Sequence, residues 1–307
     1  MAREPRNVAA SVRARLQDFA REQRDNFQRV LTRYALERFL FRLSVSPHRE
    51  IFILKGAMLY AAWLADPFRT TRDLDLLSVA DREATPLPGA VRNICAQPVA
   101  DDGLRFDTDN ILAEPFGEDR THGAIRVRIS ARLGTAIIPV QIDVGFGDAV
   151  TPGPLEVEYP VLLDQPAPIL YAYPRKTVVA EKFEAIVALD LANSRMKDFY
   201  DLLAMSRLFA FDGIPLAAAI RATFERRATA IPRDRPPPLT HAFSTDRQKL
   251  RQWRAFLARD PLLIEEPDLH TVIREVGDFI MPVALAAIDD RGIPGRWTSD
   301  GGWGPDT

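Results

Sequence analysis

The sequence has few of the features that mark secreted or membrane-spanning proteins. It contains one cysteine, Cys95, and therefore no possible intramolecular disulfide, as expected in a reducing compartment. It has no uninterrupted run of about 18 apolar residues, the length needed to span a bilayer. The best candidate, residues 51–68, is broken by charged residues and a proline. The charged residues 1–6 are not followed by the apolar segment of a signal peptide. We therefore expect a cytoplasmic protein.

The chain also lacks a large net charge of either sign. Its 40 Lys and Arg residues face 42 Asp and Glu residues, which gives a formal net charge of -2. This balance argues against a protein coated with nucleic acid over its whole surface, but it allows a local basic patch. With 307 residues, of which 47% are hydrophobic and 27% charged, the chain can form one large domain or two packed domains.

Apolar periodicity indicates helices at both ends of the chain and a mixed middle. A strand is expected at 51–54, a helix at 57–65 after Gly56 and a second strand at 74–77. Alternating residues on either side of Gly134 indicate a hairpin made of 125–132 and 140–144. The stretches expected to be helical are 8–45 and, with a break at 232–238, most of the chain from 177 onward.

This order of elements predicts an α+β fold, in which a mixed sheet with helices is joined to a helical C-terminal domain. The predicted parts are N-terminal helices (1–48), a core (49–175), a helical C-terminal domain (176–295) and a disordered tail (296–307). The core is therefore the expected place for a sheet-based functional site.

The most informative stretch is a pair of aspartates in a short predicted strand. Asp73 and Asp75 are two residues apart, so their side chains project from one face of the strand. Carboxylates this close repel each other unless a cation lies between them. Mg²⁺, or Mn²⁺, suits this arrangement because Mg²⁺ combines one or two carboxylates with phosphate oxygens and water. In the alternative interpretation, Arg69 and Arg72 simply pair with the two acids on a surface strand.

The residues before this strand indicate a phosphate-binding element. Gly56 stands at a predicted strand-to-helix junction, where a residue without a side chain lets phosphate approach the backbone. The N-terminus of the following helix would offer unpaired N–H groups. We therefore expect Lys55, Gly56 and Ala57 to bind a nucleoside triphosphate. Further candidates for binding it, through positive charge or a hydroxyl group, are Arg69, Thr70, Thr71 and Arg72. Either threonine could instead be self-modified.

Two more residues extend the predicted site. Asp143, in an apolar strand, is a candidate third carboxylate for two-metal phosphoryl transfer and for deprotonating the acceptor. A solvent-facing role for Asp143 is the alternative. Lys182 has only apolar neighbours three and four positions away on its predicted helix, so it either extends to solvent or binds the triphosphate, the role we favour. Asp198 alone indicates only an acid in the first turn of a helix.

Together these blocks resemble the AbiEii-type nucleotidyltransferase toxins of the DNA polymerase β-like superfamily. The similarity covers roughly residues 27–260, and its blocks are 52–57, 69–77, 141–145, 180–182 and 197–202. The sequence departs from the family pattern at Gly56-Ala57, where Gly-Gly or Gly-Ser is common. Ala57 lacks a hydroxyl group for phosphate but keeps its backbone donor.

The resemblance implies specific roles for several residues. Asp73 and Asp75 would bind the metal, Lys182 the nucleotide, and Asp198 would be required for activity. The implied protein is the toxin of a toxin–antitoxin pair, which transfers a nucleotide from an NTP to an acceptor such as a tRNA 3′ end. Its antitoxin would be separately encoded, with no direct binding required. The alternatives are a nucleotidyltransferase acting on a small molecule and a non-catalytic nucleotide-binding module.

A basic segment in the C-terminal half is the candidate RNA-binding surface. Eleven Lys and Arg residues lie between Arg207 and Arg259, against five acids when Asp260 is included. The surplus fits either an RNA-binding face or an ordinary solvated helical face, and the sequence leaves both open. Trp253 could stack on a base, although half-buried packing is the commoner role for such a residue.

Overall fold

The computed structural model describes residues 7–65, 71–82, 86–116, 123–259, 262, 264, 268–289, 295–299 and 302–305. The chain forms two compact units. The first contains residues up to 147, apart from 66–70, together with 155–172, and the second contains 148–154 and the chain from 173 onward. Among the described residues, no helix combines the length and apolar character needed to cross a membrane.

The first unit begins with two helices where the sequence indicates one helical stretch. Helix α1 spans Val8–Glu22 and α2 spans Phe27–Ser44. The break occurs because Asn26 adopts an extended backbone and its side chain accepts hydrogen bonds from the N–H groups of Gln28 and Arg29. The unit's other helical elements are the 3₁₀ turn η1 (Gly56–Met58), α3 (Leu59–Trp63) and α4 (Leu87–Cys95).

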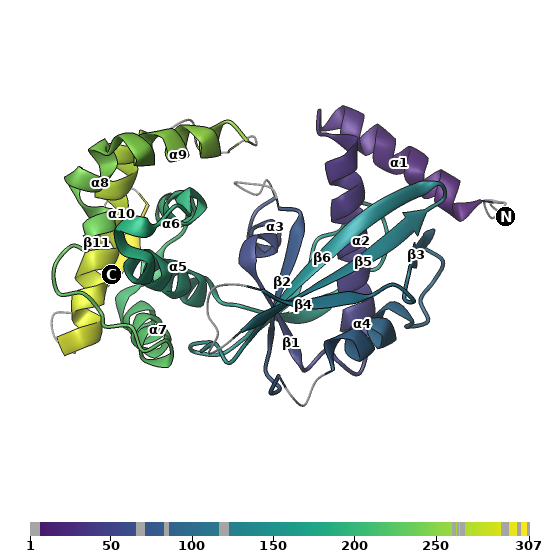
Figure 1. Ribbon diagram of the computed structural model, residues 1–307, viewed down its shortest axis with the longest axis horizontal. Coiled ribbons are helices and arrows are strands. Elements are labelled where there is room, and N and C mark those ends of the chain that lie inside the picture. Colours follow the sequence, from purple (N-terminus) through teal and green to yellow (C-terminus); the bar gives the residue numbers. More distant parts are fainter. Residues whose placement is uncertain are drawn as a thin grey trace. The chain divides into compact units, whose positions relative to one another are not determined.

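A mixed sheet is the centre of the first unit (Figure 1). Its strands follow the order β3-β5-β6-β2-β1-β8-β7, and β4 pairs with β5. The β2–β6 and β1–β8 pairs are parallel and the others are antiparallel. The bounds are β1 (Phe52–Lys55), β2 (Asp73–Ser78), β3 (Leu104–Phe106), β4 (Leu112–Phe116), β5 (Ala124–Leu133), β6 (Ala136–Phe146), β7 (Leu155–Glu158) and β8 (Ile169–Ala172).

Two of these strands confirm the predicted hairpin and place apolar side chains on one face of the sheet. β5 and β6 pair antiparallel from Ile125↔Val144 to Leu133↔Ala136, and Gly134 takes a φ of 62° in the turn. Along the central strands the even-numbered residues Leu74, Leu76, Ile142 and Val144 are at most 2% exposed. Because side chains alternate along a strand, the odd-numbered residues project from the other face.

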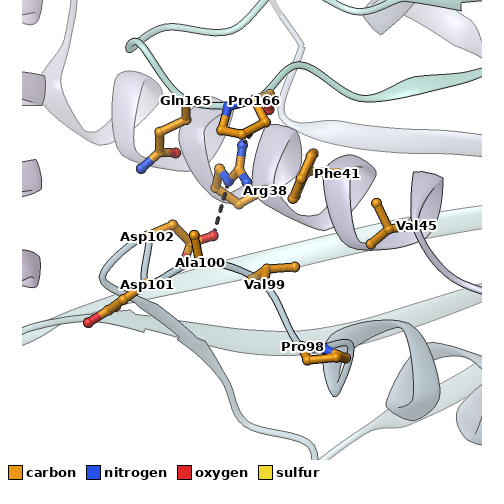
Figure 2. A pocket seen from close by; sticks show the side chains of 10 residues that line it. All are labelled: Arg38, Phe41, Val45, Pro98, Val99, Ala100, Asp101, Asp102, Gln165 and Pro166. Carbon is orange, nitrogen blue, oxygen red and sulfur yellow. Dashed lines mark hydrogen bonds and ion pairs between the residues drawn. The ribbon is translucent and has the colours of Figure 1, made fainter.

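A buried ionic cluster ties α2 to the loop before β3. Arg42 donates two hydrogen bonds to the Asp102 carboxylate, at 2.7 and 3.0 Å, and Arg38 donates a third at 3.0 Å. Burial opposes ionisation of Asp102, but the hydrogen bonds and charge of Arg42 and the hydrogen bond of Arg38 lower its pKa overall. Arg38 and Asp102 border a cavity of about 270 Å³, and its lining residues do not include the aspartates of β2. Figure 2 shows the side chains that line this cavity.

The second unit confirms the expected helical C-terminal region. Its α-helices are α5 (Arg175–Leu189), α6 (Met196–Leu208), α7 (Gly213–Arg226), α8 (His241–Thr245), α9 (Arg247–Leu257) and α10 (Leu269–Asp289), with 3₁₀ turns η2 (Asp190–Ala192) and η3 (Pro237–Leu239). Contacts of α5 with α6 and α7, and of α10 with α6 and α7, form its core (Figure 1).

The end of the chain differs from the disordered tail that the sequence predicts. Strands β10 (Arg296–Thr298) and β11 (Gly302–Gly304) pair with each other, and β10 pairs with β9 (Phe211–Asp212). The reason is two tryptophans that pack on Phe279. Trp297 donates a hydrogen bond to the Ser206 carbonyl at 2.7 Å, and Trp303 donates one to the Phe279 carbonyl at 2.8 Å.

Candidate active site

The face of the central strands opposite the buried apolar residues carries a row of charged, partly exposed residues. Asp75 on β2 is the register partner of Asp143 on β6 and of Lys55 on β1. Asp143 is in turn the register partner of Arg126 on β5. Register partners project from the same face of a sheet, on strands roughly 5 Å apart. The structure therefore aligns a cation, two carboxylates and a second cation across four strands.

Asp73 adds a third carboxylate beside this row. It lies on β2 two residues before Asp75, on the same face, and its register partner is Gln141. Both aspartates of β2 are partly exposed, whereas Leu74 between them is fully buried. The structure thus brings the predicted aspartate pair together on one accessible face.

Asp143, which the sequence predicts to be a metal ligand, is paired with an arginine in the structure. Arg126 donates from Nε to one carboxylate oxygen at 2.8 Å and from Nη2 to the other at 2.7 Å. Hydrogen bonding to Asp143, with further attraction from Asp143 and Asp73, raises the pKa of Arg126. The guanidinium also lies over the Phe116 ring, 3.5 Å from its centroid.

The pairing of Asp143 with Arg126 bears on which carboxylates can bind a metal. Within the described part of the chain, no group of three or more His, Cys, Asp or Glu side chains is arranged to hold a metal ion. Both carboxylate oxygens of Asp143 are paired with Arg126, and the metal-binding roles of Asp73, Asp75 and Asp143 stay predictions. Sequence reasoning missed Arg126 because it lies 17 residues before Asp143, and only the hairpin register reveals the pair.

Gly56 is required by the position of Asp75. Its φ is 72°, a left-handed conformation that side chains disfavour. A Cβ atom at this position would lie 2.0 Å from Oδ2 of Asp75 and 2.6 Å from its Cγ. The carboxylate of Asp75 therefore packs directly on the Gly56 backbone. The sequence predicts a glycine that admits phosphate, but the structure shows that it also makes room for a carboxylate.

The helix after Gly56 is shorter than expected. The sequence predicts a helix over 57–65, whereas the structure has the three-residue turn η1 followed by the five-residue α3. So few aligned peptide dipoles produce a small macrodipole. Any phosphate binding by Lys55, Gly56 and Ala57 must therefore rely on individual backbone N–H groups and on the Lys55 charge.

The residues before β2 are only partly described. The Thr71 hydroxyl donates to the carbonyl of Asp73 at 3.2 Å and accepts from its N–H at 3.3 Å, which fixes the start of the strand. Arg72 is exposed. Arg69 and Thr70 lie outside the described residues, so their predicted contacts with a nucleotide stay predictions.

Lys182 and Asp198 meet in the second unit. Nζ of Lys182 lies 2.9 Å from Oδ1 of Asp198 and 2.7 Å from Oδ2 of Asp201, and both acids are fully buried. Arg195 approaches the other oxygen of Asp198 at 2.8 Å. Burial opposes ionisation of Asp198, but Lys182 and Arg195 outweigh it and lower its pKa.

This cluster explains why a lysine is tolerated among apolar neighbours on α5. Its charge is matched by two acids of α6 rather than carried into solvent. The sequence indicates this cluster only through the three-residue spacing of Asp198 and Asp201, which places both acids on one face of α6. The predicted contact between Lys182 and a triphosphate stays a prediction.

Comparison with known proteins relates this arrangement to one family. The family model for the nucleotidyl transferase AbiEii toxin of type IV toxin–antitoxin systems matches residues 38–275. The crystal structure of JHP933 from Helicobacter pylori aligns with a TM-score of 0.50 and 14% identity, covering 85% of this chain and 92% of that one. A second H. pylori structure, of a candidate nucleotidyltransferase, aligns with a TM-score of 0.48 and 14% identity, covering 85% and 95%. The comparison with curated proteins found no match.

Fold and family together define the class of protein as a nucleotidyltransferase. The chain belongs to the AbiEii nucleotidyl transferase toxin family, because the family model matches well over half of it. Membership implies a nucleoside triphosphate substrate and an antitoxin partner.

We expect Gly56→Ala to impair activity by displacing Asp75. The new methyl group would collide with the carboxylate, whose far end must move by an ångström or more. Misplacement of this size can cost up to about 100-fold in rate, so turnover should fall by roughly 10- to 100-fold. The left-handed backbone should also cost about 1–2 kcal/mol of stability.

Gly134→Ala is the matched control. Gly134 has a φ of 62°, and a Cβ there would meet nothing within 4 Å. This variant should show a similar loss in the free energy of unfolding with unchanged turnover. Equal turnover in both variants would mean that the position of Asp75 does not matter for catalysis.

Proposed function

We propose that this nucleotidyltransferase uses a divalent metal held by Asp73 and Asp75 to transfer a nucleotide from an NTP to RNA, at a tRNA 3′ end. The observation that carries the proposal is the aspartate pair on one face of β2, with the Asp75 carboxylate packed on Gly56. The family supports nucleotidyl transfer, while the metal, the nucleotide site and the acceptor are our inference.

The residues present fit a magnesium or manganese ion. Mg²⁺ is commonly bound by one or two carboxylates with substrate phosphates and water as its other ligands, so a third protein carboxylate is not needed. Asp73 and Asp75 supply this hard oxygen donor set from a rigid strand. When bound, the ion would supply charge neutralisation at the phosphates.

The residues around the aspartate pair have separate roles in this proposal. Lys55 and the backbone of Gly56 and Ala57 bind phosphate oxygens, and the positive charges of Arg69 and Arg72 strengthen this binding. Arg126 holds Asp143 beside Asp75 and prevents it from turning away. We therefore assign Asp143 a positioning role instead of the general-base role that the sequence suggests.

The reaction is an in-line substitution at the α-phosphate. A hydroxyl oxygen of the acceptor forms a bond to the α-phosphorus, the bond to the bridging oxygen of the β-phosphate breaks, and pyrophosphate leaves. The hydroxyl proton passes to solvent or to a carboxylate of this face. Positioning and electrostatic stabilisation provide most of the catalysis. For Lys182 and Asp198, which pair with each other in the second unit, we keep the roles that the family resemblance implies: nucleotide binding for Lys182 and a requirement in activity for Asp198.

A labelling experiment tests the proposal. The purified protein is incubated with Mg²⁺, each of the four α-labelled nucleoside triphosphates in turn, and total tRNA or small acceptors such as aminoglycosides. We expect label in the tRNA band and an equal amount of pyrophosphate. Label only in the small acceptors would establish a small-molecule nucleotidyltransferase instead. Nucleotide binding without pyrophosphate release would indicate a non-catalytic module.

A further inference from the structure

The structure divides the eleven basic residues between Arg207 and Arg259 into two groups. Most of them are engaged inside the second unit. Four of them form ion pairs with carboxylates: Arg207 with Glu275, Arg227 with Asp148, Glu181 and Glu184, Arg233 with Asp289, and Arg235 with Asp278. Two donate hydrogen bonds to backbone carbonyls: Arg221 to that of Ala287 and Lys249 to that of Asn193. Arg226 also has an interaction partner. The six cations with these partners therefore contribute to the fold, and none of the seven is counted as part of an RNA-binding face.

The remaining four arginines lie on or directly after α9. Arg247, Arg251 and Arg254 are exposed, as is Arg259 just past the helix end. In the part of the chain that the structure describes, their side chains have no ion-pair or hydrogen-bond partner. The surplus of positive charge in this segment is thus concentrated on one helix.

The spacing places three of these arginines on one face. Arg247, Arg251 and Arg254 are four and three residues apart, which puts them in line along a helix over about 10 Å. The opposite side contains Lys249 and Trp253, which are 7% and 3% exposed. The eleven residues of α9 include no acid. We call the line of Arg247, Arg251 and Arg254 the α9 arginine face.

This arrangement is unfavourable for the helix by itself. Arginines three and four positions apart repel one another. Arg247 also lies in the first turn, next to the positive end of the helix dipole. A ligand with several phosphates would relieve both effects, whereas a single carboxylate would neutralise only one arginine.

We propose that the α9 arginine face binds the phosphate backbone of the RNA acceptor. This inference rests on the proposed function, and it identifies where the acceptor is held. A membrane surface fits less well, because helices that insert into a bilayer expose large apolar residues, whereas Trp253 of α9 is buried and its leucines and phenylalanine are only partly exposed. Trp253 is buried and packs on Phe256, so it does not stack on a base. Binding is therefore electrostatic and independent of base sequence.

The test uses the triple variant Arg247→Gln, Arg251→Gln and Arg254→Gln in the full chain. Binding of labelled tRNA is measured by fluorescence anisotropy between 50 and 200 mM salt, since each phosphate contact adds about 0.7–0.9 to the slope of log affinity against log salt. We expect the slope to fall by about 2–3 and the affinity to fall at least 10-fold at the lower salt concentration. Each single variant should lower the slope by about 1.

A charge-matched triple variant is the control. Arg21→Gln, Arg105→Gln and Arg132→Gln replace three exposed arginines of the first unit and change the net charge equally. This variant should bind tRNA with the wild-type slope. Equal slopes for the α9 variant, the control and the wild type would overturn the inference. If the α9 variant lost binding to phosphatidylserine vesicles but still bound tRNA like the wild type, the inference would be overturned in favour of a membrane-binding surface.

Failure of this inference can be distinguished from failure of the proposed function. If wild-type protein labels tRNA but the α9 variant binds tRNA normally, only the location of the RNA-binding surface is wrong. If no tRNA is labelled under any condition, the proposed function fails, whatever the α9 variant does. Circular dichroism and thermal unfolding of each variant show whether the helix itself is retained.

Discussion

Asp75→Asn is expected to lower turnover by roughly 1,000-fold or more. The substitution keeps the shape of the side chain but removes the charge that we propose binds the metal and, through it, the triphosphate. Loss of several kcal/mol of transition-state stabilisation corresponds to about three orders of magnitude in rate. Because Asp75 is partly exposed and lies beside another carboxylate, the free energy of unfolding should change by less than about 1 kcal/mol.

The comparison variant is Asp107→Asn. Asp107 is a partly exposed carboxylate of the same unit that accepts hydrogen bonds from the Asn110 side chain. It should retain wild-type pyrophosphate release and nucleotide incorporation. Wild-type turnover in Asp75→Asn would contradict the proposed metal-binding role of the aspartate pair, since the proposal assigns no other residue to replace that charge.

Lys182→Met is expected to reduce the free energy of unfolding at pH 7 by about 3–5 kcal/mol. The variant leaves Asp198 and Asp201 buried together without the ammonium group that lies within 2.9 Å of each. Removing one partner of a buried ionic cluster costs this much because the remaining charge is no longer compensated. Chemical denaturation at pH 7 measures the change.

The loss should depend on pH. In the wild type the pKa of Asp198 is lowered by Lys182 and Arg195 against the effect of burial, so its contribution to stability is present above about pH 4 and is lost as the pH falls through the lowered pKa. In the variant the carboxyl of Asp198 should protonate at higher pH because the charge of Lys182 is gone, and the difference in stability between the two proteins should narrow on acidification.

Lys197→Met supplies the control at an exposed position of α6 and should change stability by about 0.5 kcal/mol or less. An equally small effect for Lys182→Met would show that the cluster does not stabilise the second unit.

The sequence predicts the local features of the fold well. The β5–β6 hairpin follows from strict alternation around Gly134, and the paired aspartates follow from the two-residue period of a strand. The helical C-terminal half follows from its apolar period. Each of these depends on residues that are close in the chain, so a short window of sequence contains the information.

The sequence does not predict features that depend on register or packing between distant segments. The pairing of Asp143 with Arg126 requires the alignment of two strands, and the packing of Asp75 on Gly56 requires β1 and β2 to be neighbours. The ordered strands at 296–298 and 302–304 depend on tryptophans that reach Phe279 on α10. A tail rich in glycine and polar residues gives no local indication of such contacts.

The most direct test of the proposed site is a crystal structure with Mn²⁺ and a non-hydrolysable nucleoside triphosphate, in which anomalous scattering locates the manganese. We expect a manganese peak about 2.1 Å from carboxylate oxygens of both Asp73 and Asp75, with phosphates on the Gly56 side and no such peak in Asp75→Asn. Nucleotide bound with its phosphates away from β2, and no ion at either aspartate, would contradict the proposed site.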